Sequence, residues 1–279
     1  MNLVFIGGGN MAAAIIGGLR AQAGPPDDIR VVERDAQRRA LLERDFAVAT
    51  QADIDPAVTG ADIVVLAVKP GDMAAACHAL GPVAAQALVL SIAAGIPSEA
   101  IARWCGLEAV VRAMPNTPAL IGRGITGLIA RPGVTPGQRD AAATLLRAVG
   151  DIVWLDDEAQ LDAVTAISGS GPAYVFYFME ALQEAAGQMG MRADQARHFA
   201  VQTFVGAAQL AAQSTDAVAV LRERVTSKGG TTAAALARLQ ADGVGPAITA
   251  AAFAALERSR EMAREFAPPS PSPSGRGPG

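Results

Sequence analysis

The residues with the clearest chemical use form a glycine-rich turn close to the start of the chain. It lies between an apolar run that predicts a strand and an Ala- and Ile-rich run that predicts a helix, and its residues are Gly7, Gly8, Gly9, Asn10, Met11 and Ala12. In this G-x-G-x-x-A pattern the first glycine allows a tight turn, and the second lets the backbone approach a pyrophosphate. The alanine allows close helix–strand packing, and the helix N-terminus offers N–H groups to phosphate. The pattern predicts a dinucleotide site; the alternative is a glycine-rich turn without a ligand.

The segment Glu33-Arg34-Asp35, at the end of the second predicted strand, could distinguish two such dinucleotides. An acidic residue there binds the ribose 2′-hydroxyl of NAD, whereas an arginine favours the 2′-phosphate of NADP. The two indications conflict, and a surface ion pair is a further alternative. We favour NADPH and keep NADH as the alternative.

A second polar loop, Val225-Thr226-Ser227-Lys228-Gly229-Gly230-Thr231-Thr232, precedes an alanine-rich helical run. The glycines free the backbone, the threonines are suited to cap the helix, and the helix N-terminus offers N–H groups to an anion such as a carboxylate. The loop is therefore a candidate carboxylate site, and the alternative is an ordinary helix cap.

Histidine, cysteine and metal chemistry have little support in this sequence. The chain has only His78, His198, Cys77 and Cys105, and their spacing matches neither a zinc site nor a disulfide framework. We predict no metal site and no histidine general base.

Alternating strand and helix patterns predict the framework that positions these loops. Most predicted strands are continuously apolar, as expected for a parallel sheet covered on both faces. They cover residues 3–6, 29–33, 63–68, 88–92, 110–113, 127–130 and 151–154. The predicted helices between them cover residues 11–21, 36–44, 97–104 and 136–149.

The strand pattern stops after residue 157. Residues 158–266 are compatible with five to seven helices, several of them apolar around most of their circumference, which indicates burial in a bundle or a subunit interface. We expect an α/β chain: an N-terminal Rossmann-type doubly wound sheet at 1–157, then an all-α C-terminal domain at 158–266. Residues 267–279 are rich in Pro, Ser and Gly and predict a disordered tail.

Composition excludes other classes. The formal net charge is −4, which gives no support to a nucleic-acid partner. The apolar start lacks a basic region and contains the glycine turn, so it does not resemble a signal peptide. We expect a cytoplasmic protein with neither a nucleic-acid nor a membrane partner.

Six segments, taken together in chain order, resemble the pyrroline-5-carboxylate reductase family over roughly residues 2–265. Besides the glycine turn and the loop at 225–232, they are Ala67-Val68-Lys69-Pro70, Ser91-Ile92-Ala93-Ala94-Gly95, Arg112-Ala113-Met114-Pro115-Asn116-Thr117-Pro118 and Ser168-Gly169-Ser170-Gly171-Pro172-Ala173-Tyr174. The resemblance implies reduction of the cyclic imine 1-pyrroline-5-carboxylate to L-proline, the last step of proline biosynthesis, with NAD(P)H as hydride donor. It also implies a homodimer with interlocked helical domains, often assembled further into a ring of dimers such as a homodecamer.

The resemblance also implies a role for each loop. The glycine turn would hold the pyrophosphate, Arg34 would lie near the 2′-phosphate, and Asn116 would lie close to the nicotinamide. The ribose and nicotinamide would be lined by Ala67, Val68, Lys69, Pro70, Ala93, Ala94 and Gly95. The substrate would be held by Ser227, Gly230, Thr231 and Thr232, with Thr232 as the hydrogen-bonding catalytic contact to the imine nitrogen and Ser227 beside it. Lys228 departs from the family, in which many members have proline or another uncharged residue there.

The implied chemistry agrees with the scarcity of histidine. A cyclic imine can arrive already protonated, so the protein must orient it against the nicotinamide and exclude water rather than supply a strong acid.

Two other functions remain as alternatives. A β-hydroxyacid-type dehydrogenase shares the domain plan but is known for a lysine on the first long helix of the second domain, and residues 172–189 contain none. A nucleotide-binding sensor without turnover would need only the first domain, and the polar loop at 226–232 argues against it.

The two lysines give a prediction. Of 23 cationic residues only Lys69 and Lys228 are lysine, and both lie in proposed site loops. Because an ammonium and a guanidinium fork are not interchangeable, Lys69→Arg should raise the Kd for the cofactor more than a surface Arg→Lys change does. Equal effects in a cofactor titration would contradict a special role for Lys69.

Overall fold

The computed structural model describes residues 1–22, 28–54, 60–81, 84 and 86–266. The chain divides into two compact units, one formed by Met1–Gly169 with the segment from Ala255 onward, and the other by Ser170–Ala254. The tail expected at 267–279 lies outside the described residues.

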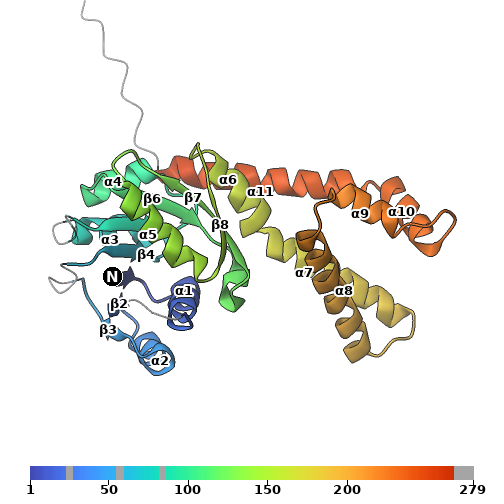
Figure 1. Ribbon diagram of the computed structural model, residues 1–279, viewed down its shortest axis with the longest axis horizontal. Helices are drawn as coiled ribbons and strands as arrows, with labels where there is room; N and C mark the ends of the chain where they lie inside the picture. Colours follow the sequence, from blue (N-terminus) through green and yellow to red (C-terminus); the bar gives the residue numbers. More distant parts are fainter. Residues whose placement is uncertain (23–27, 55–59, 82–83, 85, 267–279) are drawn as a thin grey trace, which may run out of the picture. The chain divides into compact units, whose positions relative to one another are not determined.

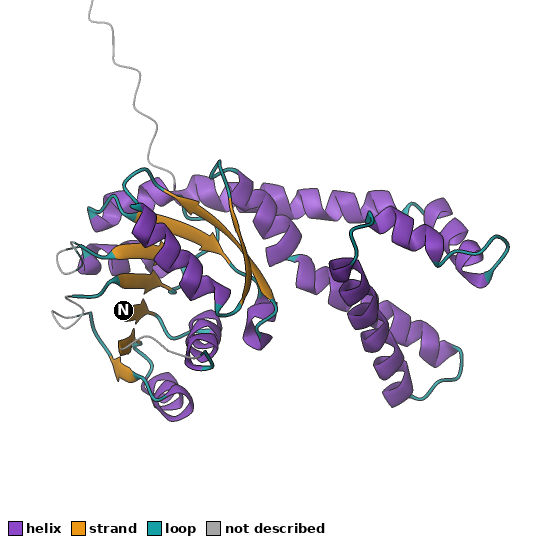
Figure 2. Cartoon of the chain, viewed as in Figure 1, coloured by secondary structure: helices purple, strands orange, loops and turns teal. Residues whose placement is uncertain are grey.

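Among the described residues of the first unit, eight strands form one sheet (Figures 1 and 2). They are β1 (Asn2–Ile6), β2 (Asp28–Val32), β3 (Ala49–Gln51), β4 (Ile63–Leu66), β5 (Leu88–Ser91), β6 (Val110–Met114), β7 (Gly124–Ala130) and β8 (Gly150–Trp154). Their order is β3-β2-β1-β4-β5-β6-β7-β8, and every neighbouring pair is parallel except β6 and β7. The order of the strands along the sheet reverses next to β1, and this makes the sheet doubly wound, the class that the sequence predicted.

Helices cover both faces of the sheet because its strands are apolar on both sides. Leu3 and Phe5 of β1 belong to a core with α1 (Asn10–Arg20), α2 (Ala36–Phe46) and α5 (Pro136–Arg147). The alternate residues Val4 and Ile6 belong to a second core with α3 (Met73–Leu80) and α4 (Ser98–Cys105). The period of two along a strand therefore divides the apolar residues between two helical layers.

Three features differ from the sequence expectation. The strand β3 and the helix α3 were not predicted; β3 has only three residues, too few for a periodic pattern. The expectation of a parallel sheet is wrong at β6 and β7, which are antiparallel. Between them lies only a short 3₁₀ turn, η3 (Thr117–Ile121), whereas a parallel connection needs a crossover of about a dozen residues or more.

The rest of the chain is helical. In the first unit α6 (Gln160–Val164) continues into a π turn, η4 (Thr165–Gly169). The second unit contains α7 (Gly171–Gln188), α8 (Ala193–Gln213), α9 (Val218–Arg224), α10 (Thr231–Ala241) and the first part of α11 (Val244–Phe266). No single helix within the described ranges is long and apolar enough to cross a membrane, although the bent pair α10 and α11 meets the length and composition criteria together.

The second unit leaves large apolar side chains exposed. Tyr177 of α7 is 73% exposed, Phe199 of α8 is 60% exposed and Phe253 of α11 is 61% exposed. The helices α7, α9 and α10 contain no buried residue among those described. A helix apolar on several sides needs another surface to cover it.

A half-buried ion pair joins three elements of the first unit. Glu158, which precedes α6, accepts hydrogen bonds from Arg112 Nη1 in β6 at 2.5 Å and from the N–H and hydroxyl of Ser98 at 2.7 and 2.5 Å. Burial alone would raise the pKa of Glu158, but the hydrogen bonds from Ser98 and Arg112 outweigh it and hold the pKa below its ordinary value. The charged form of Glu158 therefore stabilises the fold.

Glu158→Gln should lower the free energy of unfolding by about 1–2 kcal/mol at neutral pH. This loss is smaller than that expected on breaking a fully buried ion pair, because the Glu158 side chain is partly exposed. Since the folded pKa is depressed, this contribution is fully present above the unfolded pKa of about 4.3 and is lost as pH falls through the folded value. Urea unfolding of both proteins from pH 7 to pH 3 should show the difference shrinking. The control Glu108→Gln breaks an exposed pair with Arg131; an equal, pH-independent loss in both variants would contradict the assignment.

Candidate functional site

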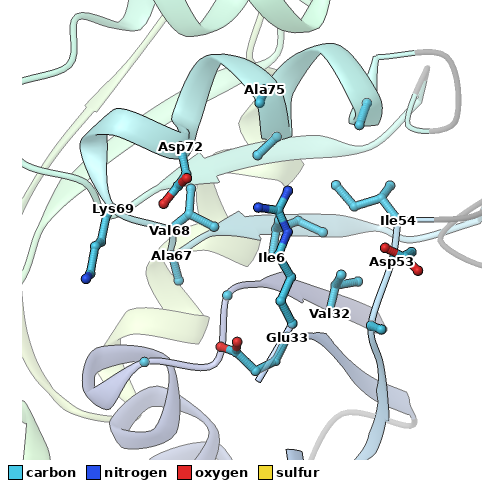
Figure 3. A pocket seen from close by; sticks show the side chains of 16 residues that line it. Ile6, Val32, Glu33, Asp53, Ile54, Ala67, Val68, Lys69, Asp72 and Ala75 are labelled. Atoms are coloured by element: carbon cyan, nitrogen blue, oxygen red, sulfur yellow. The ribbon is translucent and has the colours of Figure 1, made fainter. Parts of the chain in front are cut away.

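A cavity of about 450 Å³ opens at the carboxyl ends of β1, β2, β3 and β4. It lies where the strand order reverses, the position at which open α/β sheets bind their ligands. Its walls come from the glycine turn after β1, the ends of β2 and β3, the loop after β4, and one side of α3 (Figure 3). Lys69 and Asp53 lie on opposite sides of it in this view.

The glycine turn has the geometry that a pyrophosphate requires. Gly7 has φ +97° and donates its N–H to the Val32 carbonyl at 2.8 Å, and a Cβ there would lie 2.7 Å from the Ala67 carbonyl oxygen. A Cβ at Gly9 would meet no described atom within 4 Å, so this side of the turn is open. Gly9 is the N-cap of α1, and no described side chain caps that helix. An open glycine beside uncapped N–H groups fits a phosphate group.

The structure brings together six of the residues predicted to bind the cofactor, because Gly7, Gly9, Arg34, Ala67, Val68 and Lys69 line this cavity. Gly8 is buried beneath the turn, Asn10, Met11 and Ala12 form the first turn of α1, and Pro70 begins the 3₁₀ helix η2 (Pro70–Asp72).

The other predicted cofactor residues do not line the cavity. Ala93, Ala94 and Gly95 follow β5 and Asn116 follows β6, so they lie further along the sheet. Gly95 has φ +73°, and a Cβ there would lie 2.8 Å from the Cβ of Met262 in α11. The loop after β5 is thus packed against the last part of α11 in the first unit.

Several residues that line the cavity were not predicted from the sequence. They are Ala52, Asp53 and Ile54 after β3, and Asp72, Ala75, Ala76 and Ala79 at η2 and α3. The first group depends on a strand too short to predict. The second could have been found, because Pro70 followed by an alanine-rich run is a helix-start signal.

The three residues that left the cofactor choice open have separate contacts. The Glu33 carboxylate accepts from the N–H groups of Gly8 and Asp35, at 2.8 and 2.9 Å. The Asp35 carboxylate caps α2 by accepting from the Gln37 N–H at 2.8 Å. Arg34 lines the cavity, and no hydrogen bond or ion pair joins its guanidinium to another described residue. Of these three side chains, only that of Arg34 forms no hydrogen bond or ion pair with another described residue.

Asn116 is a buried connector. Its Nδ2 donates to the Ser168 carbonyl in the π turn at 3.1 Å, and its Oδ1 accepts from the Ile125 N–H in β7 at 3.0 Å. It is 8% exposed. The side chain therefore joins the loop after β6 to two neighbouring elements.

The polar loop at 226–232 lies in the second unit, between α9 and α10. Gly229 has φ +75°, and the Gly230 N–H donates to the Ser227 carbonyl at 3.1 Å. The expectation that the threonines cap the helix is wrong: Gly230 is the N-cap, and no described side chain caps α10. Thr231 and Thr232 already lie inside its first turn. The uncapped N–H groups of α10 can therefore bind an anion.

Two protein-family models match the chain. Residues 2–95 match NADP oxidoreductase coenzyme F420-dependent, and residues 158–262 match Pyrroline-5-carboxylate reductase dimerisation. The pyrroline-5-carboxylate reductase of Pseudomonas aeruginosa is 48% identical over 95% of this chain and 97% of its own length. The chain belongs to the pyrroline-5-carboxylate reductase family. The family enzyme from Haemophilus influenzae is 43% identical over 95% of this chain and 98% of its own.

Solved structures of the pyrroline-5-carboxylate reductase family agree with the fold. The Coxiella burnetii protein has a TM-score of 0.88 and 40% identity, covering 94% of this chain and 98% of that one. The Plasmodium falciparum protein, solved with NADP bound, has a TM-score of 0.84 and 26% identity over the same shares. The family and fold class predicted from the sequence are confirmed.

Asn116→Ala should lower the free energy of unfolding by about 2 kcal/mol, because it leaves the Ile125 N–H and the Ser168 carbonyl without their partner. Urea unfolding measures the loss. Asn2→Ala, which removes an exposed amide contact at 3.5 Å, is the matched control. An Asn116→Ala loss no larger than that of the control would show that the amide is not a structural connector.

Proposed function

We propose that this chain reduces 1-pyrroline-5-carboxylate to L-proline with NADPH, as the last step of proline biosynthesis. The observation that carries the proposal is the 48% identity to a pyrroline-5-carboxylate reductase across 95% of the chain, which includes both loops that could bind ligands. NADPH rather than NADH is supported by Arg34, which lines the cavity while the neighbouring acids are engaged. The NADP oxidoreductase match at 2–95 gives further support.

In this proposal NADPH supplies the hydride, and the chain's own residues bind and orient the cofactor and the substrate. Gly7, Gly8 and Gly9 form the turn that receives the pyrophosphate, and the free N–H groups of Asn10, Met11 and Ala12 at the start of α1 hold it. Arg34 pairs with the 2′-phosphate. The ribose and nicotinamide are lined by Ala67, Val68, Lys69, Pro70, Ala93, Ala94 and Gly95, with Asn116 fixing the adjacent loop.

The substrate site in this proposal is the loop at 227–232. The free N–H groups at the start of α10 bind the carboxylate, and Gly230 allows it to approach the backbone. The hydroxyl of Thr232 contacts the imine nitrogen, with Ser227 and Thr231 beside it. Since the imine arrives protonated, the protein's task is orientation and exclusion of water.

We further propose a cytoplasmic homodimer with interlocked helical domains, assembled into a ring of dimers such as a homodecamer. The match to a dimerisation family at 158–262 and the exposed aromatic side chains of α7, α8 and α11 support self-association. In the proposed dimer each chain consists of a dinucleotide-binding domain at 1–157 and a helical domain at 158–266.

The reaction is tested by following NADPH and NADH oxidation with 1-pyrroline-5-carboxylate as substrate. A larger kcat/KM with NADPH is expected. Absence of oxidation with either cofactor would favour a nucleotide-binding sensor. Oxidation of a 3-hydroxy acid with NAD(P)⁺ would favour a β-hydroxyacid-type dehydrogenase.

Thr232→Ala should lower kcat by about ten- to a hundredfold, the effect of losing one hydrogen bond to a charged group. The Kd for NADPH should stay unchanged. Thr203→Ala, which removes a hydroxyl bonded within α8, should keep full turnover. A folded Thr232→Ala protein with wild-type kcat would exclude the assigned contact.

A further inference from the structure

Glu33 directs its carboxylate toward the glycine turn rather than across the cavity (Figure 3). Its Oε2 accepts from the Gly8 N–H at 2.8 Å and its Oε1 from the Asp35 N–H at 2.9 Å. Gly8 is buried and Glu33 is half-buried. Hydrogen bonds from N–H groups to a carboxylate are stronger than neutral ones, so these two contacts fix the side chain.

The other polar group of Gly8 is held from the same segment. Its carbonyl accepts from Arg38 Nε at 2.6 Å, and Arg38 Nη2 donates to Asn10 Oδ1 at 3.1 Å. A Cβ at Gly8 would lie 2.5 Å from Leu42 Cδ1, so the turn also rests closely on α2. Both backbone polar groups of Gly8 are therefore engaged by charged side chains from the β2–α2 segment.

We propose that Glu33 is a positioning residue that fixes the dinucleotide-binding turn, and that it does not select NADH through the ribose hydroxyl. The inference rests on the proposed cofactor site. Holding the turn in place before binding removes an ordering cost that is common to NADPH and NADH. Glu33 should therefore affect both cofactors alike, whereas a residue that binds the 2′-hydroxyl should affect NADH alone.

The decisive variant is Glu33→Asp, which keeps the charge but is too short to reach both N–H groups. Glu33→Gln keeps the length but removes the charge. Glu99→Gln, on the exposed face of α4, is the control for loss of a carboxylate elsewhere. The Kd for each cofactor is measured on the full chain by the fluorescence of the bound nicotinamide, and the thermal midpoint of each variant is recorded.

Glu33→Asp should raise both Kd values by a similar factor, on the order of tenfold for one weakened hydrogen bond to a charged acceptor. The control should leave both unchanged. A Glu33→Asp protein that loses NADH affinity while keeping that for NADPH would overturn the inference and identify Glu33 as the ribose contact. Unchanged binding of both cofactors would overturn it as well.

Amide hydrogen exchange across residues 7–11 without cofactor gives a second readout. The Gly8 amide should exchange slowly in the wild-type protein and faster in Glu33→Asp. Fast exchange at Gly8 in the wild-type protein would overturn the inference even if the variants did not fold. If the wild-type protein failed to reduce the imine, the proposed function would fail, while this exchange measurement would still decide the role of Glu33.

Discussion

The first unit depends on the absence of a side chain at residue 7. With φ +97°, Gly7 turns the chain out of β1, bonds to the end of β2 through the Val32 carbonyl, and lies where a Cβ would be 2.7 Å from the Ala67 carbonyl oxygen after β4. A larger residue would adopt this conformation with strain and would displace the backbone of residue 67. The turn, the end of β2 and the loop after β4 form three walls of the cavity, so one glycine sets the positions of all three.

The parts that sequence could predict are those controlled by neighbouring residues. Apolar runs such as the one at 63–68 mark central strands, and the glycine pattern marks the turn, because both depend on residues close in sequence. The strand β3 has three residues and is defined by its pairing with β2, so Asp53 and Ile54 could not be placed in the cavity wall. The direction of the Glu33 carboxylate depends on a contact with Gly8, 25 residues away. Sequence could therefore name the conflict between Glu33 and Arg34 but not resolve it.

The two units reach stability by different means. In the first, alternate residues of each central strand enter two helical cores, and side chains such as Phe5, Ile15 and Leu90 are fully buried. In the second, α7 and α8 pack together, yet Phe176 and Met189 stay 59% and 80% exposed. Apolar surface on that scale needs a cover, and a second copy of the chain provides one in the proposed dimer. Folding of the helical unit would then be linked to association, while the sheet carries its own core.

Several arginines hold parts of the first unit together, whereas the two lysines do not. Arginines make structural contacts that use their several planar donors: Arg38 holds the Gly8 carbonyl, Arg39 donates to the carbonyls of Glu33 and Arg34, and Arg112 pairs with Glu158. The side-chain ammonium groups of Lys69 and Lys228 form no hydrogen bond or ion pair within the described part of the chain, and both residues are exposed in loops proposed to meet anions. A guanidinium fork suits a fixed geometry, whereas an ammonium on a flexible stem can follow a mobile charge. Residue type alone does not separate the two roles, because Arg34 also lines the cavity and its guanidinium forms no hydrogen bond or ion pair with another described residue.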